Sequence, residues 1–330
     1  MRILLIIALA GTIASTSQAT PAQTPSADSL PHNCASVTTP FVGTLCMPPD
    51  DSGKHPAMIL LGGSEGGDSF SRLAPLFAAH GYVTASLAYF GAPALPPVLV
   101  NVPVETVGSA VNALDARPDV NGKIGILGIS RGGELSLLAA STYSQIKAVV
   151  AIVPSPIAYM GLGASNIPTG CAWTKNGSAL PCVHPDAAAR AQITAEFRNH
   201  QPLVLAPFYD ASRKSNPSEA TASFFPLEKI AGPVMCLAGG DDEMWNSSSH
   251  CDLTMQYLKN RKHPFPDSEV AYPNAGHLFI AAVGGPQSAL NSVTVGGVTM
   301  AFGGTPQGDA SAASAAWQKI WQFLTGALGG

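Results

Sequence analysis

The chain of 330 residues is 46% hydrophobic and only 12% charged, which is too apolar for an intrinsically disordered protein and sufficient for a full hydrophobic core. The formal net charge is −4, and no stretch concentrates Lys and Arg, so the composition argues against a nucleic-acid-binding protein. Gly (33 residues) and Pro (28 residues) show no repeat period, which argues against a fibrous or solenoid protein. The chain is a globular candidate.

The first segment has the features of a secretory signal peptide. Arg2 is followed by an apolar run from Ile3 to Ala14, and Ser17-Gln18-Ala19 resembles a cleavage site. The apolar run is shorter than the roughly 20 residues that span a bilayer, so a membrane anchor is disfavoured. We therefore expect residues 1–19 to be a signal peptide and residues 20–33 a disordered linker. The mature protein would be periplasmic or extracellular, with no stable membrane insertion.

Export would place the six cysteines in an oxidising compartment, where an even number favours disulfides. Sequence alone does not choose among the possible connectivities, but neighbouring cysteines suggest the pairs Cys34–Cys46, Cys171–Cys182 and Cys236–Cys251. The second pair brackets Asn176-Gly177, which is a hairpin turn signal. A zinc site is the competing interpretation, but the chain has no C-x-x-C or H-E-x-x-H motif, and His250 has no partner at ligand spacing.

Apolar strands alternate with helical patterns along most of the chain. The predicted strands are 57–61, 82–88, 123–129, 147–153, 233–238 and 269–272. The predicted helices are 71–80, 104–117, 134–141, 247–260 and 310–324. Strands separated by helices of this length indicate parallel βαβ units. We therefore expect a doubly wound, mostly parallel α/β sheet in one domain over residues 34–330.

The most informative motif is Gly128-Ile129-Ser130-Arg131-Gly132, which follows the predicted strand 123–129 and precedes the predicted helix 134–141. This is G-x-S-x-G in the strand, turn and helix context of a nucleophile elbow. Ser130 would sit in a strained turn that exposes its hydroxyl, and the glycines would prevent collisions with the adjoining strand and helix. The motif predicts Ser130 as a nucleophile.

A serine nucleophile needs an imidazole base and a carboxylate that orients the base, in the chain order Ser, Asp or Glu, His for this fold. Ala275-Gly276-His277 follows the last predicted strand, so His277 is the best candidate for the base. The strand 233–238 ends in a run of carboxylates, from which we choose Asp242. Asp241 remains an alternative, because one residue of register decides which side chain faces the histidine. The other histidines precede the serine or fall in predicted helix ends and irregular segments, where surface or capping roles are expected: His32, His55, His80, His184, His200, His250 and His263.

Hydrolysis also needs donors for the oxyanion. One should be the backbone N–H of Arg131, and the second should come from the glycine-rich turn 62–67, at Gly63 or Ser64. The same turn has the spacing of a phosphate-binding P-loop, but Asp68 stands where the lysine would be required. No G-x-G-x-x-G fingerprint opens the first βα turn, so no dinucleotide and no other cofactor is expected.

Several of these segments together resemble the catalytic domain shared by acyl-CoA thioesterases and bile-acid-CoA:amino-acid acyltransferases. The segments are 59–67, 87–96, 128–134, 240–245, 272–278, 303–317 and 323–324, and the resemblance covers most of residues 56–326. It implies an α/β-hydrolase fold related to dienelactone hydrolases, with a triad that falls on Ser130, Asp242 and His277. Amidating members of the family use Cys, so Ser130 resembles the thioesterase branch and implies water as the acceptor.

Residues 154–230 interrupt the βα alternation and contain the aromatic residues Phe208, Tyr209, Phe224 and Phe225. Such an insertion commonly caps an apolar pocket, so the aromatic side chains could bind an acyl chain. Packing of an irregular segment is an equal alternative. Next to the nucleophile, Arg131 and Glu134 could bind substrate or form a structural ion pair.

These observations predict an exported serine hydrolase, with neither cofactor nor metal, that cleaves a small-molecule ester or thioester through an acyl-enzyme on Ser130. His277 would be the general base, and Asp242 would orient it. The alternatives are a carboxylesterase or peptidase of the same fold that does not use coenzyme A, and a catalytically inactive binding protein, because a fold alone does not guarantee activity.

Overall fold

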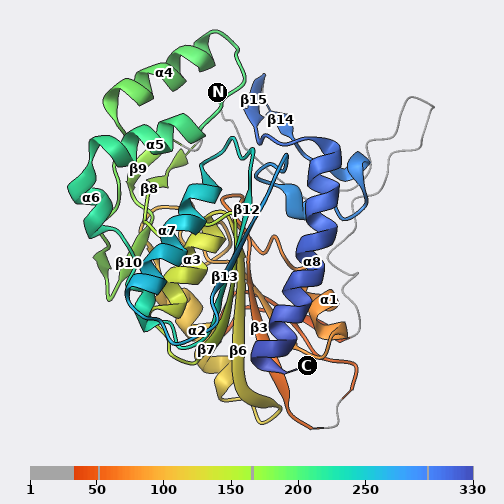
Figure 1. Ribbon diagram of the computed structural model, residues 1–330. Helices are drawn as coiled ribbons and strands as arrows, with labels where there is room; N and C mark the ends of the chain where they lie inside the picture. Colours follow the sequence, from red (N-terminus) through yellow and green to blue (C-terminus); the bar gives the residue numbers. More distant parts are fainter. Residues whose placement is uncertain (1–32, 51–52, 165–166, 296, 330) are drawn as a thin grey trace.

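The computed structural model describes residues 33–50, 53–164, 167–295 and 297–329 (Figure 1). The predicted signal peptide, residues 1–19, and all but the last residue of the predicted linker lie outside the described residues. Within the described ranges, no helix combines the length and the apolar character that a membrane crossing requires.

An eight-stranded sheet forms the centre of the protein, in the order β1-β2-β4-β3-β6-β7-β12-β13. Neighbouring strands from β4 to β13 pair in parallel, as the alternating pattern predicts, whereas β1 and β2 form an antiparallel edge that the sequence analysis did not anticipate. The strands are β1 (Cys34–Val37), β2 (Gly43–Cys46), β3 (His55–Leu61), β4 (Val83–Leu87), β6 (Val120–Ile129), β7 (Ile146–Ile152), β12 (Val234–Gly239) and β13 (Ser268–Tyr272).

Helices cover both faces of this sheet, so the central parallel strands are buried on both sides. Successive β3 side chains alternate between the two layers: Ile59 packs with the helices on one face, and Leu60 packs with those on the other. The first face carries α2 (Glu105–Asp115), α3 (Arg131–Ala140) and α7 (Ser247–Asn260), and the second carries α1 (Ala74–Ala79) and α8 (Pro306–Leu328). Figure 1 shows α8 on the opposite side of the sheet from α3 and α7.

The region 154–230 forms small sheets and helices with an apolar core of its own. Its elements are β8 (Met160–Leu162), β9 (Pro168–Cys171), β10 (Trp173–Lys175), β11 (Ser178–Ala179), α4 (Ala187–Arg198), α5 (Ala206–Ser215), α6 (Pro217–Ala222) and the 3-10 helix η3 (Leu227–Lys229). A short strand from the main domain, β5 (Val102–Pro103), pairs with β10. The predicted turn at Asn176-Gly177 does join β10 to β11, with φ values of 50° and 74°.

The aromatic residues of this region serve packing. Phe208 and Tyr209 are buried together around Tyr159, and Phe225 is buried in the core on the α2 and α3 face of the sheet. Phe224 stacks on Tyr257 of α7, with ring centroids 4.7 Å apart. Of the two interpretations that the sequence left open, core packing therefore matches the positions of these side chains.

A second hairpin, absent from the sequence prediction, lies between the last strand of the sheet and α8. It consists of β14 (Ser292–Val295) and β15 (Val298–Ala301), preceded by the 3-10 helices η4 (Phe279–Ala281) and η5 (Pro286–Ser288). The continuation of β15 through Phe302 and Gly303 contacts the loops that follow β12 and β13. The hairpin therefore adjoins the carboxyl edge of the sheet.

All three disulfides suggested by the sequence are formed. Cys34–Cys46 joins facing residues of β1 and β2, and Cys171–Cys182 closes the segment that contains the β10–β11 hairpin. Cys236–Cys251 ties the buried strand β12 to α7. Three disulfides fit a protein of an oxidising compartment.

We expect removal of the Cys236–Cys251 disulfide to lower the free energy of unfolding by about 3 kcal/mol, the cost in the chain-entropy model for a closed loop of this size. The cysteines are 15 residues apart, and both are buried. Urea unfolding of the Cys236→Ser/Cys251→Ser variant measures the loss. An unchanged midpoint would show that packing of α7 on β12 is sufficient without the covalent bond.

The buried His250 of α7 should make the folded protein sensitive to acid. Its Nδ1–H donates to the Pro154 carbonyl at 3.1 Å, and the Tyr159 hydroxyl donates to Nε2 at 3.3 Å, which suits a neutral ring. Burial lowers the pKa of His250 from 6.5 to about 4. Between these values the unfolded chain binds a proton that the folded protein does not, so the free energy of unfolding rises with pH across this window.

His250→Gln should therefore reduce the gain in stability between pH 4 and pH 7, by up to about 3 kcal/mol. Urea unfolding at both pH values tests this expectation, with the exposed His80→Gln as the matched control. An equal pH dependence in His250→Gln and the parent protein would contradict the assignment.

Candidate active site

The predicted nucleophile elbow is a sharp turn between β6 and α3. Ser130 has φ 56° and ψ −121°, a strained conformation between the end of the strand and the first helical residue. A Cβ atom at Gly128 would lie 2.1 Å from the Gly132 carbonyl oxygen, and a Cβ atom at Gly132 would lie 2.0 Å from that of Gly62. The two glycines are therefore required for the close approach of strand, helix and neighbouring loop.

Ser130, His277 and Asp242 form one continuous chain of hydrogen bonds. The distance between His277 Nε2 and Ser130 Oγ is 2.8 Å, and His277 Nδ1 lies 2.8 Å and 3.0 Å from the two carboxylate oxygens of Asp242. The His277 and Asp242 side chains are buried, with exposed fractions of 4% and 1%. With the proton on Nδ1 held by the carboxylate, Nε2 can accept the serine hydroxyl proton.

The turn after β12 presents Asp242 to the imidazole instead of Asp241. The Asp242 carboxylate also accepts the backbone N–H groups of Met244, at 2.9 Å, and Trp245, at 3.2 Å. At Asp241, by contrast, the backbone N–H donates to the Ala275 carbonyl. The register of this turn therefore brings Asp242, the acid chosen from the sequence, to His277.

The loop that carries His277 is held by residues that the sequence analysis missed. The His277 N–H donates to the Phe302 carbonyl at 2.7 Å, and the Gly276 N–H donates to Asp309 Oδ1 at 2.8 Å. Asn291 donates to the other Asp309 oxygen, also at 2.8 Å. Burial raises the pKa of Asp309, and these two hydrogen bonds oppose the rise. The signal that could have identified it is an acidic residue in the first turn of α8.

The residues that follow Asp242 are also held by hydrogen bonds to backbone carbonyls. The Glu243 N–H donates to the same Phe302 carbonyl, at 3.4 Å, and the Trp245 indole donates to the Val153 carbonyl at 2.9 Å. The Trp245 ring also lies edge-on to His277, with 5.9 Å between ring centroids. The Phe302 carbonyl thus links the loop that carries Asp242 (the acid loop) to the loop that carries His277 (the base loop).

The two predicted sources of oxyanion donors both lie beside Ser130. Arg131 is the first residue of α3, so its N–H is among those that have no partner within the helix. A Cβ atom at Gly63 would lie 3.4 Å from Ser130 Cβ, which places the glycine-rich turn against the nucleophile. Ser64 follows in this turn and is partly exposed. The Gly63 N–H donates to Glu65 Oε1 at 2.9 Å, a contact that the sequence analysis did not foresee.

The glycine-rich turn is anchored to the sheet by buried polar groups. Asp68 accepts hydrogen bonds from the hydroxyls of Thr44, at 2.7 Å, and Ser86. Burial raises the pKa of Asp68, which these hydrogen bonds oppose. The Tyr89 hydroxyl lies 2.5 Å from the Gly63 carbonyl oxygen. The residue that stands in place of a P-loop lysine therefore holds the turn to β2 and β4.

Arg131 and Glu134 form a structural ion pair, one of the two interpretations open from the sequence. The guanidinium lies 2.7 Å from Glu134 Oε2 and donates to the Met160 carbonyl at 2.9 Å. The Trp173 indole donates to Glu134 Oε1 at 2.5 Å. Burial raises the pKa of Glu134 to about 7, and the charge of Arg131 opposes the rise. The side chains of the first turn of α3 therefore hold the region 154–230.

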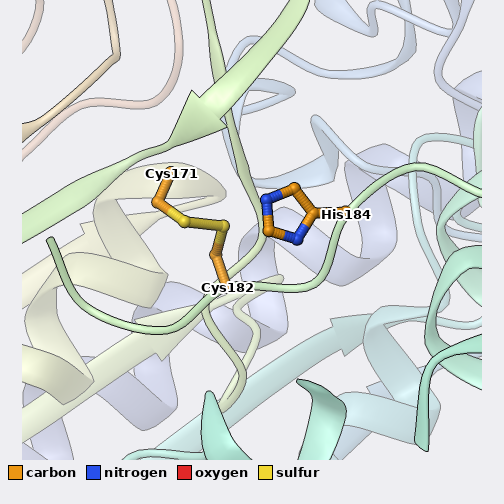
Figure 2. Close-up of side chains that lie close together, drawn as sticks. All are labelled: Cys171, Cys182 and His184. Carbon is orange, nitrogen blue, oxygen red and sulfur yellow. A yellow bond between two sulfur atoms is a disulfide. The ribbon is translucent and has the colours of Figure 1, made fainter. Parts of the chain in front are cut away.

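In the described part of the chain, one cluster of potential metal ligands lies outside the triad. Figure 2 shows His184 beside the sulfur atoms of Cys171 and Cys182, and their donor atoms lie within 4.8 Å of one another. The two sulfurs are joined in a disulfide, whereas zinc binds thiolates. His184 Nδ1 is 3.1 Å from Glu219. In the oxidised protein this cluster is thus a disulfide next to a histidine that is hydrogen-bonded to Glu219.

Two surface cavities adjoin the triad acid. A cavity of about 490 Å³ lies between α5 and the turn after β12, lined in part by Asp210, Lys214 and Asn246. Another, of about 750 Å³, lies next to the β14–β15 hairpin and is lined in part by Asp241 and Glu243. Asp242 contributes to both cavities, so they lie beside the acid end of the hydrogen-bonded chain.

Two solved structures with a similar fold are hydrolases by their titles. An α/β-hydrolase, GrgF from Penicillium sp. sh18, matches with a TM-score of 0.50 and 15% identity over 91% of this chain and 99% of that chain. A putative dienelactone hydrolase from Klebsiella pneumoniae matches with a TM-score of 0.51 and 16% identity over 86% of this chain and 91% of that chain. At these identities the likeness shows the fold, which is the α/β-hydrolase fold that the sequence predicts.

Curated relatives are acyl-coenzyme A thioesterases. Acyl-coenzyme A thioesterase 6 of Mus musculus is 31% identical over 295 residues, and acyl-coenzyme A thioesterase 1 of Homo sapiens is 29% identical over 290 residues. Each alignment covers 87% of this chain but only 63% of the relative. The family described as BAAT / acyl-CoA thioester hydrolase C terminal matches residues 102–330. The chain belongs to this BAAT and acyl-CoA thioester hydrolase family.

Proposed function

We propose that this protein hydrolyses carboxylic esters or thioesters through an acyl-enzyme on Ser130. The observation that carries the proposal is the hydrogen-bonded chain from Ser130 Oγ through the His277 ring to the Asp242 carboxylate. Membership of a family whose members include acyl-CoA thioesterases supports the same reaction class. The strained elbow exposes one face of the nucleophile to an incoming carbonyl.

In the proposed reaction, His277 Nε2 takes the hydroxyl proton while Ser130 Oγ attacks the acyl carbon. The negative charge then develops on the carbonyl oxygen, where the Arg131 and Gly63 N–H groups would stabilise it. His277 returns the proton to the departing alcohol or thiol, and the acyl group stays on Ser130. Water, deprotonated by the same imidazole, then attacks the acyl-enzyme and releases the acid. Asp242 keeps the ring in the required tautomer throughout.

The proposed site of action is outside the cytoplasm, in the periplasm or the extracellular space. Three disulfides support an oxidising compartment, as does the signal-like sequence of residues 1–19. We expect coenzyme A thioesters to be scarce in such a compartment, so esters and thioesters of other leaving groups belong to the proposed substrate class alongside acyl-CoA. No cofactor or metal takes part in the proposed steps.

Ser130→Ala should lower kcat on p-nitrophenyl esters by at least about ten-thousand-fold, because no other group supplies the acyl acceptor. The thermal midpoint should stay nearly unchanged, since the group removed is one hydroxyl that bonds to His277 in the site. A fluorophosphonate probe should label Ser130 in the folded parent protein. The control is Ser109→Ala of α2, which should be labelled like the parent. Failure of the probe to label any serine would favour a binding protein without catalytic activity.

Neutralising Asp242 and neutralising Asp241 should have very different effects on kcat. Asp242→Asn should lower kcat by roughly a thousand- to ten-thousand-fold, because the amide stabilises the wrong histidine tautomer. Asp241→Asn should change it by less than about tenfold. Steady-state kinetics on both variants tests this difference, and the reverse ranking would assign the acid role to Asp241.

A further inference from the structure

One of the two proposed oxyanion donors is already occupied by a carboxylate of the protein itself. The Gly63 N–H donates to Glu65 Oε1 at 2.9 Å. A Cβ atom at Gly63 would lie 2.9 Å from the other Glu65 oxygen and 3.4 Å from Ser130 Cβ. The carboxylate therefore lies within the turn that faces the nucleophile, at the N–H where charge would develop on the substrate.

An oxyanion and this carboxylate cannot use the same donor at the same time. Both are anions that need the Gly63 N–H, and like charges at hydrogen-bond distance repel strongly away from bulk water. With Glu65 in place, a tetrahedral intermediate would lose the Gly63 N–H as a donor. The loss of one such donor typically slows catalysis by a hundred- to a thousand-fold. Full turnover rate therefore requires the Glu65 side chain to leave this position.

The surroundings allow the side chain to move and keep the backbone in place. Asp68 and the Tyr89 hydroxyl hold the glycine-rich turn, and the Gly67 N–H donates to the Phe90 carbonyl at 2.9 Å. Glu65 itself is partly exposed, and among the described residues no Lys, Arg or His forms an ion pair with it. Rotation of one side chain therefore frees the Gly63 N–H.

We propose that Glu65 determines substrate specificity by closing the oxyanion position in the resting enzyme and by repelling acyl groups that carry a negative charge. The inference rests on the proposed function of Ser130. A substrate carbonyl must displace the carboxylate, which then stays close to the acyl group because the turn is fixed. Uncharged acyl groups fit this arrangement, whereas an acyl chain with its own carboxylate brings a second anion beside Glu65.

The test uses two matched substrates, mono-p-nitrophenyl adipate and its methyl ester, which differ by one negative charge and one methyl group. The parent protein should hydrolyse the uncharged ester with a kcat/KM at least about tenfold higher than the acid, the size expected for a like charge several ångströms away. Glu65→Ala should raise kcat/KM for both and reduce the ratio to less than about threefold. Glu65→Gln keeps an acceptor for the Gly63 N–H without the charge. It should therefore reduce the kcat/KM ratio between the two substrates as Glu65→Ala does, but increase the rate on the neutral ester less than Glu65→Ala does.

The control is Glu269→Ala, which removes the same charge from an exposed position on β13 and should leave the ratio unchanged. A Glu65→Ala variant with an unchanged ratio, or with lower activity on the neutral ester at an unaltered thermal midpoint, would overturn the inference. Fluorophosphonate labelling of Ser130 in the parent protein separates the two proposals. A labelled, active parent with no Glu65 effect refutes only this inference, and an unlabelled parent refutes the proposed function itself.

Discussion

The candidate site depends on one hydrogen bond, between His277 and Ser130, which joins groups 147 residues apart in the chain. It forms because β6, β12 and β13 are parallel, so the turns after them emerge at the same edge of the sheet. A strand pairing shifted by one residue would turn Asp242 or His277 away from its partner. The buried sheet therefore determines whether these three turns can meet.

The turns themselves are positioned from outside the sheet. The Phe302 carbonyl accepts N–H groups from both the acid loop and the base loop, and Asp309 of α8 holds the residue before His277. On the nucleophile side, Glu134 and Arg131 tie the first turn of α3 to the region 154–230. Each group of the hydrogen-bonded chain is thus supported by a different part of the fold. Glu65, at the glycine-rich turn, is partly exposed.

Local sequence patterns were sufficient to predict the parallel strands, the elbow at Ser130 and the three disulfides, because each depends on a short apolar run, a glycine spacing or neighbouring cysteines. The edge strands β1 and β2 escaped prediction because they are short, and β1 is partly exposed on both sides. Asp309 and Glu65 were missed for a different reason. Their contacts to Gly276 and Gly63 depend on how loops dock, which no periodicity records.

The central claim is that the acyl group passes through Ser130, and rapid acid quench of the protein with a slowly hydrolysed acyl ester tests it most directly. Mass spectrometry of the peptide that contains Ser130 should show the mass of the acyl group within the first turnover, and the adduct should decay at the rate of acid release. Product formation with an unmodified peptide, or an adduct on another residue, would contradict the account.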